Sequence, residues 1–430
     1  MSAATVALPY GDSQLRVVLG AGRFTTLAPV PPPALDDPSL ALRTALATPI
    51  ASPPLAACVR PGDRVTIVVA DGTRATGIRA LMPTLLTVLE HAGVADARVR
   101  VLFALGIHRR QTAAEHAAIL GPEVAARVAH ADHDCDDDAT HVALGGDGPA
   151  ATFRLNRGVL DGDLVVVTGA LGFHYLAGFG GGRKALLPGV AARASVQAFH
   201  RHSLAADPGA GRHVAAAPGV RAGNPLDALA TAAAARVPRT FLVNTIMVPG
   251  GRIGAVLAGD VHAAFTRGCD AYRAAFTVPI ATRRPVVIVS AGGAPRDGDL
   301  VQTQKAIAAA AAALAPGGMM LVLARCAEGT GQAELLRWFT HPDRAAHLRA
   351  LHEAFSVPGQ TALALREHAE RAEVYLHSTL PPDLVARTGM RPVACVEDFF
   401  AAVARRHGRD VEGYVLPEGA RYLPVVEAEA

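Results

Sequence analysis

The feature that most constrains this chain is a regular alternation of short apolar, β-branched runs with helical patterns rich in alanine and leucine. Residues 64–71 (RVTIVVAD), 99–105, 163–169 (DLVVVTG) and 240–248 (TFLVNTIMV) are typical of buried strands, and a helix is expected near 77–92. Strands separated by helices run parallel, with the helices covering their sheet. We therefore predict an α/β fold with mainly parallel sheets.

A second series of predicted strands and helices begins after Arg283-Arg284-Pro285, where the charged and proline residues indicate a break in the chain near residue 280. A chain of 430 residues is also too long for one comfortable hydrophobic core. The second half has predicted strands at 285–292, 318–325 and 372–378, and predicted helices at 303–314 and 396–407. We predict two α/β domains with the active site in the cleft between them: an N-terminal domain at 1–279, rejoined by the tail 410–430, and a C-terminal domain at 280–409.

The overall composition argues against several classes of partner. The formal net charge is +3 and no dense basic run appears, so a nucleic-acid partner is not expected. No stretch reaches the roughly 20 apolar residues that span a bilayer, and the start lacks the pattern of a signal peptide. Five scattered cysteines without a CxxC pair suit a reducing compartment. We expect a cytoplasmic protein with no membrane partner.

Lysine is almost absent from the chain. Of 41 lysines and arginines, only Lys184 and Lys305 are lysines. A primary amine can act as a nucleophile, which a guanidinium cannot, so the two survivors suggest chemistry. Lys184 follows Gly180, Gly181 and Gly182 in a run whose glycines allow close approach of backbone to a phosphate. The run is not a Walker A loop, because Arg183 precedes the lysine. Covalent tethering or a Schiff base fits it better.

Polar groups follow consecutive predicted strands at their carboxyl ends. They are the runs 71–74 (DGTR), 106–109 (GIHR), 172–175 (GFHY) and the loop 294–304. Because the carboxyl ends of parallel strands meet at one edge of a sheet, we expect these groups to line one pocket.

Two histidine-rich segments could bind a metal. His200 and His202 end a helix predicted from about residue 190, and their spacing of two allows only one of them to face a given site. The acidic stretch 130–141 (HADHDCDDDATH) matches no standard zinc spacing, and we interpret it as a solvated turn.

The run Gln302-Thr-Gln-Lys305 is predicted to open a helix directly after its loop. A helix N-terminus favours an anion, and Lys305 adds a positive charge. Arg74 is expected on the other side of the cleft, so Arg74 and Lys305 could bind one carboxylate from both domains.

Taken together, these runs resemble the nickel-pincer lactate racemase family. The resemblance is carried by DGTR at 71–74, GIHR at 106–109, GFHYLAGFGGGRKALLPGVA at 172–191 followed by His200, QTQK at 302–305, and the shorter matches at 8–11, 223–225 and 416–419. It covers nearly the whole chain, and its central segment is highly specific.

The resemblance implies a role for each candidate residue. Lys184 would hold a pyridinium-dithiocarboxylate mononucleotide as a thioamide, His200 would bind its nickel, and His108 and His174 would serve as alternating acid–base groups. The residues expected beside this cofactor are Asp71, Thr73, Gly180, Gly181 and Gly182, and those expected on the substrate carboxylate are Arg74, Gln302 and Lys305. Loss of the α-hydrogen as hydride avoids building negative charge beside a carboxylate, and one histidine per face can take the hydroxyl proton.

One departure bears on the substrate. Lactate-acting members of the family have an aromatic residue where Val301 stands, so we expect a 2-hydroxy acid bulkier than lactate. The expected partners are this small molecule and the proteins that make and load the cofactor. Two alternatives stay open: a zinc-dependent lyase or hydrolase that uses the same histidines, and a non-catalytic carrier of the nickel-pincer nucleotide.

Overall fold

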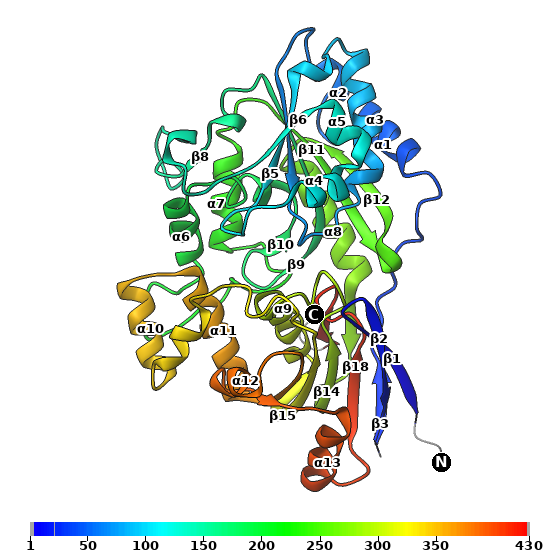
Figure 1. Ribbon diagram of the computed structural model, residues 1–430, viewed down its shortest axis with the longest axis vertical. Coiled ribbons are helices and arrows are strands. Elements are labelled where there is room, and N and C mark those ends of the chain that lie inside the picture. The colour runs from blue at the N-terminus through cyan, green and yellow to red at the C-terminus, as the bar shows by residue number, and fades with distance from the viewer. Residues whose placement is uncertain (1–3, 21, 428–430) are drawn as a thin grey trace.

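The computed structural model describes residues 4–20 and 22–427 and confirms the predicted α/β architecture with mainly parallel sheets. Figure 1 shows two bodies, one above the other, with β9 and β10 of the upper body facing α9 of the lower one. Each body is built around one large sheet, which we call sheet I in the upper body and sheet II in the lower.

Within these residues, sheet I has seven strands in the order β12-β11-β9-β4-β5-β6, with β10 added to β9. All neighbours are parallel except β12 on β11 and β10 on β9. The strands are β4 (Val65–Ala70), β5 (Val99–Ala104), β6 (Ala129–Asp132), β9 (Leu164–His174), β10 (Gly178–Gly180), β11 (Thr240–Val248) and β12 (Arg252–Gly259).

The continuous apolar runs of sheet I exist because helices cover both of its faces. Along β4, Ile67 and Val69 belong to the hydrophobic cluster under α1 (Pro38–Ala47) and α3 (Ile78–His91), whereas Val68 faces the opposite cluster. The opposite cluster includes side chains of α6 (Arg193–Arg201), α7 (Pro225–Ala234) and α8 (Ala263–Phe276).

Sheet II is parallel at every pairing, in the order β17-β16-β15-β14-β18-β3. Its strands are β3 (Arg23–Thr26), β14 (Arg284–Ser290), β15 (Leu314–Leu323), β16 (Glu373–His377), β17 (Arg391–Pro392) and β18 (Glu412–Leu416). The helices that connect and flank them include α9 (Leu300–Ala311), α10 (Arg344–Glu353), α11 (Val357–Arg371), α12 (Pro382–Arg387) and α13 (Val396–His407).

The tail and the N-terminal segment differ from the expected domain organisation. We expected 410–430 to rejoin the N-terminal domain; within this tail β18 lies in sheet II between β14 and β3, whereas residues 423–426 pair with residues 277–280, at the end of the predicted N-terminal range. Two segments from opposite ends of the chain thus extend sheet II beyond β14: β18 pairs with β14, and β3 pairs with β18. The further strand β19 (Leu423–Val426) pairs with β13 (Thr277–Ile280). The division at residue 280 remains a prediction.

Two predicted elements, β11 and α13, have the bounds expected from the sequence, but β9 continues to His174 instead of ending at Gly169. The extension is stabilised by β10, which pairs with residues 172–174. In the part of the chain that the structure describes, no helix is both long and apolar enough to cross a membrane.

Candidate active site

A cavity of about 320 Å³ lies at the carboxyl ends of β4, β5 and β9, where sheet I faces α9. Every site residue predicted from the sequence lines it except Gly182. The predicted residues in its wall are Asp71, Thr73, Arg74, His108, His174, Gly180, Gly181, Lys184, His200, Gln302 and Lys305. The polar groups at the strand ends therefore line one cavity, as expected from the sequence.

Asp71 and His108 form a hydrogen-bonded pair at neighbouring strand ends. Nδ1 of His108 lies 2.5 Å from Oδ2 of Asp71, while the hydroxyl and backbone N–H of Thr73 donate to Oδ1 at 2.5 and 3.1 Å. Burial alone would raise the pKa of Asp71, but the His108 ring and its hydrogen bond outweigh burial and hold the pKa well below its usual value. The carboxylate is thus ionised and can only accept, so Nδ1 of His108 carries a proton, and in the neutral form of the ring the lone pair is on Nε2.

His174 has the opposite arrangement of its ring nitrogens. It ends β9, and its Nδ1 accepts hydrogen bonds from the backbone N–H groups of Leu176 at 3.2 Å and Ala177 at 3.1 Å. The neutral ring therefore carries its proton on Nε2. Burial lowers the pKa of His174 well below its usual value, and the cations Lys184 and Lys305 lower it further.

Lys184 lies in a single 3₁₀ turn, Gly182–Ala185, that follows β10. Burial, the largest cause, lowers the pKa of its amine from 10.5 to about 7, and the charge of Arg74 adds to the shift. A substantial fraction of the amine is therefore neutral near pH 7 and able to attack an acyl carbon.

Two of the three glycines before Lys184 are required by their surroundings. At Gly181 (φ +83°) a Cβ would lie 2.7 Å from the carbonyl oxygen of Ala170, so the chain tolerates no side chain there. Gly182 (φ +56°) packs against Phe265, and its N–H donates to Oδ1 of Asn244 at 3.2 Å. The N–H of Gly182 is thus already bonded inside the protein, and this glycine does not line the cavity.

His200, but not His202, reaches the cavity. Both histidines lie at the end of α6, where His200 is in the last turn and the exposed His202 caps the helix. Nδ1 of His200 lies 2.9 Å from the carbonyl oxygen of Val196, so Nδ1 is the protonated nitrogen and Nε2 has a free lone pair. Burial lowers the pKa of His200 to about 4, which keeps the ring neutral. A neutral imidazole whose second nitrogen is bound to a carbonyl is the usual form of a metal ligand.

Arg74, Gln302 and Lys305 meet in the wall of the cavity. Oε1 of Gln302 accepts from Nη1 of Arg74 at 2.9 Å and from Nζ of Lys305 at 2.5 Å. Lys305 does not lie at the helix N-terminus as predicted, because α9 begins at Leu300 and Lys305 is in its second turn. The side chain of Asp299 caps that N-terminus by accepting from the N–H of Gln302 at 2.7 Å, so two side-chain cations remain as the anion-binding groups.

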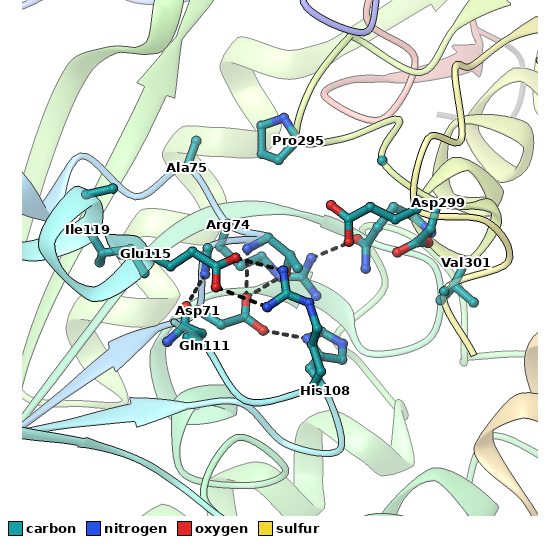
Figure 2. Close-up of a pocket in the computed structure, with 18 of the residues that line it drawn as sticks. Asp71, Arg74, Ala75, His108, Gln111, Glu115, Ile119, Pro295, Asp299 and Val301 are labelled. Carbon is teal, nitrogen blue, oxygen red and sulfur yellow. Dashed lines mark hydrogen bonds and ion pairs between the residues drawn. The ribbon is translucent and has the colours of Figure 1, made fainter. Parts of the chain in front are cut away.

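A wider cleft of about 1100 Å³ opens beside this cavity and shares part of its wall. Figure 2 shows Asp71, His108 and Arg74 on one side of the cleft and Asp299 and Val301 on the other. Val301 borders both spaces, together with Ile107. A group attached to a molecule held at Arg74 therefore has room in the cleft.

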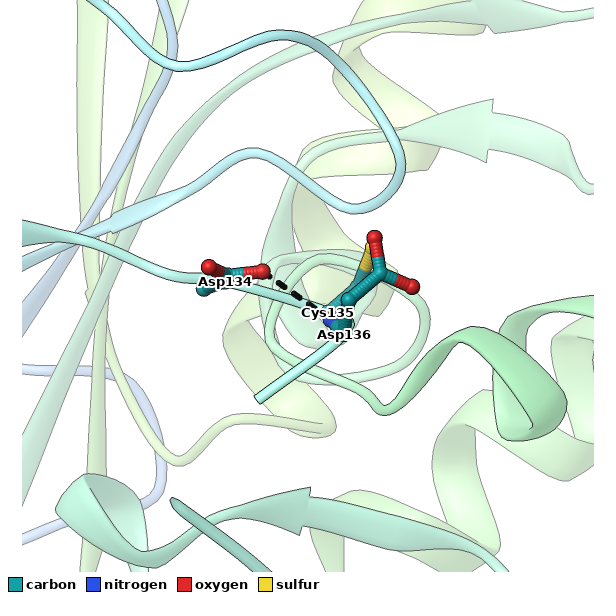
Figure 3. A group of neighbouring side chains, drawn as sticks. All are labelled: Asp134, Cys135 and Asp136. Carbon is teal, nitrogen blue, oxygen red and sulfur yellow. Dashed lines mark hydrogen bonds between the residues drawn. The ribbon is translucent and has the colours of Figure 1, made fainter. Parts of the chain in front are cut away.

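The acidic stretch gathers three potential metal ligands, Asp134, Cys135 and Asp136, shown in Figure 3. Each carboxylate already has an arginine partner: Asp134 pairs with Arg110, and Asp136 with Arg193 at 2.5 and 2.7 Å. Burial raises the pKa of the Cys135 thiol, which disfavours the thiolate that a metal needs. These ion pairs argue against a metal site at these three residues, but the interpretation of the whole stretch as a solvated turn was wrong, because residues 130–132 belong to β6 and His133, Cys135 and His141 are buried.

Some polar residues near the site were not identified from the sequence. Tyr272, Arg296 and Arg421 line the cavity, and Gln111 lies behind Asp71. Gln111 alone carried a signal, since it follows His108 by three residues in the same strand-end loop.

Comparisons with known proteins identify the family of the chain. The lactate racemase N-terminal domain family matches residues 10–212, and the lactate racemase C-terminal domain family matches residues 281–423. The chain belongs to the lactate racemase family. It is 28% identical over 340 residues to a lactate racemase of Thermoanaerobacterium thermosaccharolyticum, covering 78% of each chain, and 25% identical over 390 residues to one of Lactiplantibacillus plantarum, covering 87% of this chain and 88% of that one. These relatives support a racemase, and hence an isomerase, function.

Solved structures share the fold. The lactate racemase apoprotein from T. thermosaccharolyticum superposes with a TM-score of 0.86 at 24% identity, covering 98% of this chain and all of that one. A Thermotoga maritima protein superposes with a TM-score of 0.68 at 15% identity, covering 92% of this chain and all of that one.

Proposed function

We propose that the protein racemises or epimerises 2-hydroxy acids with a nickel-pincer nucleotide tethered to Lys184. The observation that carries the proposal is the meeting, in one cavity, of two imidazoles in opposite protonation arrangements with two cations that share one oxygen. The substrate carboxylate would bind Arg74 and Lys305, and its hydroxyl would lie between His108 and His174.

The residues present fit the cofactor that the family implies. A buried amine with a pKa of about 7 suits formation of a thioamide at Lys184, and Nε2 of His200 suits a borderline-soft metal such as nickel. When bound, the group would supply an electrophilic carbon that accepts and returns the α-hydrogen with its electron pair. Asp71, Thr73, Gly180 and Gly181 are proposed to line its site.

The two histidines would move the hydroxyl proton. Nε2 of His108 has the free lone pair, so His108 is the group set to take the proton from one enantiomer, while Asp71 stabilises the imidazolium that forms. His174 would serve the opposite face and would donate its Nε2 proton as the imidazolium, because a neutral ring that lost this proton would be left as an imidazolate. Both the imidazolium and the base form with a free Nε2 lone pair carry a proton on Nδ1, so each role requires Nδ1 to leave the N–H groups of Leu176 and Ala177.

Loading and substrate binding would change the charge around His174. After burial, the causes that depress its pKa are the positive charges of Lys184, Lys305 and Arg74. Acylation of Lys184 removes one of these charges, and the substrate carboxylate neutralises the other two. The pKa of His174 would therefore rise towards its usual value in the complex, where it is needed as a proton donor.

The room beside Val301 supports a substrate longer than lactate. Val301 and Ile107 border both the cavity and the wide cleft, so a side chain attached to the α-carbon could extend into that space. This proposal is separate from the chemistry and has its own test below.

The decisive experiment offers cofactor-loaded protein a panel of single-enantiomer 2-hydroxy acids and follows each by chiral chromatography. Formation of the opposite enantiomer, or of one epimer, supports the proposal. A loaded protein that converts no member would favour a carrier of the nucleotide. Stoichiometric zinc, with no mass added to Lys184, would favour a zinc lyase or hydrolase.

A further inference from the structure

Gln111 connects the two loops that carry Asp71 and His108. It lies three residues after His108, and its Oε1 accepts from the backbone N–H of Gly72, next to Asp71, at 2.8 Å. Figure 2 shows Gln111 beside Asp71. A single side chain from the loop after β5 therefore holds the turn after β4, and the Asp71–His108 hydrogen bond spans the same two loops.

Asp132, at the end of β6, fixes the orientation of the Gln111 side chain. Oδ2 of Asp132 accepts from the backbone N–H of Gln111 at 2.7 Å, and Oδ1 accepts from its Nε2 at 3.0 Å. An ionised carboxylate only accepts, so the amide nitrogen of Gln111 must face Asp132 and its oxygen must face Gly72.

His116 completes the support from behind. Its Nε2 lies 2.8 Å from Oδ1 of Asp132, and its ring stacks on Phe103 with centroids 4.4 Å apart. The side chains of Asp132 and His116 are 9% and 15% exposed, so solvent screens their hydrogen bonds little. The result is a chain of hydrogen bonds, His116–Asp132–Gln111–Gly72, that ends at the turn bearing Asp71.

A direct role for Gln111 in binding substrate is disfavoured by its partners. Gln111 borders the wide cleft, but its oxygen is held by Gly72 and its amide nitrogen by Asp132. Substrate binding would require breaking this arrangement, whereas its present geometry fixes the separation of two loops.

We infer that Gln111 is a positioning residue, supported by Asp132 and His116, that sets the Asp71–His108 hydrogen bond and so the aim of the His108 base. The catalytic part of this inference rests on the proposed function; the geometric part does not. A base displaced by about 1 Å can lose a large factor in rate, so a hydrogen-bond chain of this kind has a measurable effect.

The test compares Gln111→Leu, Asp132→Asn and the double variant with wild type. The control is Arg110→Ala, which removes the Arg110–Asp134 ion pair of the same loop. This ion pair does not contact Asp71 or His108. In the metal-free protein, the short His108 Nδ1–H···Asp71 bond should give a low-field proton resonance, assigned by its absence in His108→Gln. We expect Gln111→Leu to shift or broaden this resonance and Arg110→Ala to leave it unchanged.

In the loaded enzyme, we expect Gln111→Leu to lower kcat about tenfold while KM stays within about twofold. The double variant should be no slower than the slower single variant, because both act through one chain of contacts. Unchanged resonance and wild-type kcat in Gln111→Leu would overturn the inference. If wild type racemises no hydroxy acid, the proposed function fails, and the resonance still decides the geometric inference.

Discussion

Arg74 and Lys305 come from opposite bodies of the molecule and donate to the same atom, Oε1 of Gln302. Arg74 follows β4 of sheet I in the chain, whereas Lys305 lies on α9, the helix that follows β14 of sheet II. Burial and the charge of Arg74 lower the pKa of Lys305 well below its usual value, so an anion bound between the two side chains would favour the charged form of the amine. A substrate carboxylate would be such an anion and would bind the two bodies together.

Removal of one cation tests this grip. Lys305→Ala should raise KM or lower kcat/KM about tenfold or more, since a hydrogen bond to a charged group is worth about 1.5–3 kcal/mol. Steady-state kinetics in both directions measure the effect, with nickel content and the mass of the Lys184 adduct as controls that should not change. Wild-type kinetics in Lys305→Ala would remove this residue from the binding site.

Lys184→Arg keeps a positive charge and removes the primary amine. We expect normal folding together with complete loss of covalent cofactor and of activity, because a guanidinium cannot form the thioamide. Intact-protein mass spectrometry is the measurement, and Lys305→Arg is the matched control that should keep the adduct. An adduct retained on Lys184→Arg would contradict the tether.

His200→Ala should keep the covalent adduct and lose the metal. Of the two histidines at the end of α6, only His200 lines the cavity, and its Nε2 has the lone pair that can bind a metal. Metal analysis per protein chain, beside the adduct mass, separates the two losses. His202→Ala, at the exposed cap of the same helix, should hold nickel normally. Equal nickel in wild type and His200→Ala would transfer the assignment away from His200.

Substrate size is tested at Val301. Val301→Phe narrows the space shared by the cavity and the cleft, so the ratio of kcat/KM for longer 2-hydroxy acids to that for lactate should fall about tenfold. Wild-type turnover of lactate that equals or exceeds that of every longer acid would refute the size argument without touching the racemase proposal.

Buried histidines should make the unloaded protein sensitive to acid. Burial lowers the pKa of His347 to about 4 and that of His368 to about 3, whereas both titrate near 6.5 when unfolded. Between these values the unfolded state binds more protons, so stability is present above about pH 6.5 and is lost as pH falls towards 4. Each group contributes on the order of 2 kcal/mol of this loss at pH 5.

Denaturant unfolding at pH 7.5 and pH 5 measures this loss. His347→Gln should show a smaller difference between the two pH values than wild type, whatever its absolute stability. An equal difference in the two proteins would show that His347 does not contribute.

The sequence predicts the strands well because parallel strands buried on both faces must be apolar throughout, as in β4 and β11. It predicts the grouping of Asp71, His108 and His174 for a related reason, since each ends or follows a neighbouring strand. The predicted end of β9 was wrong. A glycine at position 169 is typical of a strand end, but the strand continues to His174 because residues 172–174 pair with β10.

Other features depend on tertiary contacts that no local pattern reveals. The contact of Gln111 with Asp132 depends on how the loop after β5 folds back towards the end of β6. The first turn of α9 was hidden because residues 294–304 resemble a loop, and the side chain of Asp299 that caps the helix is recognised only once the helix is seen.

The place of β18 in sheet II has a consequence for biosynthesis. β3 has no neighbour other than β18 among the described strands, so this early segment has no partner until residues 412–416 have left the ribosome. Sheet I can assemble earlier, from strands that end with β12 at Gly259. The nascent chain would therefore emerge with one body formed and with β3 waiting as an exposed strand for nearly the whole of translation.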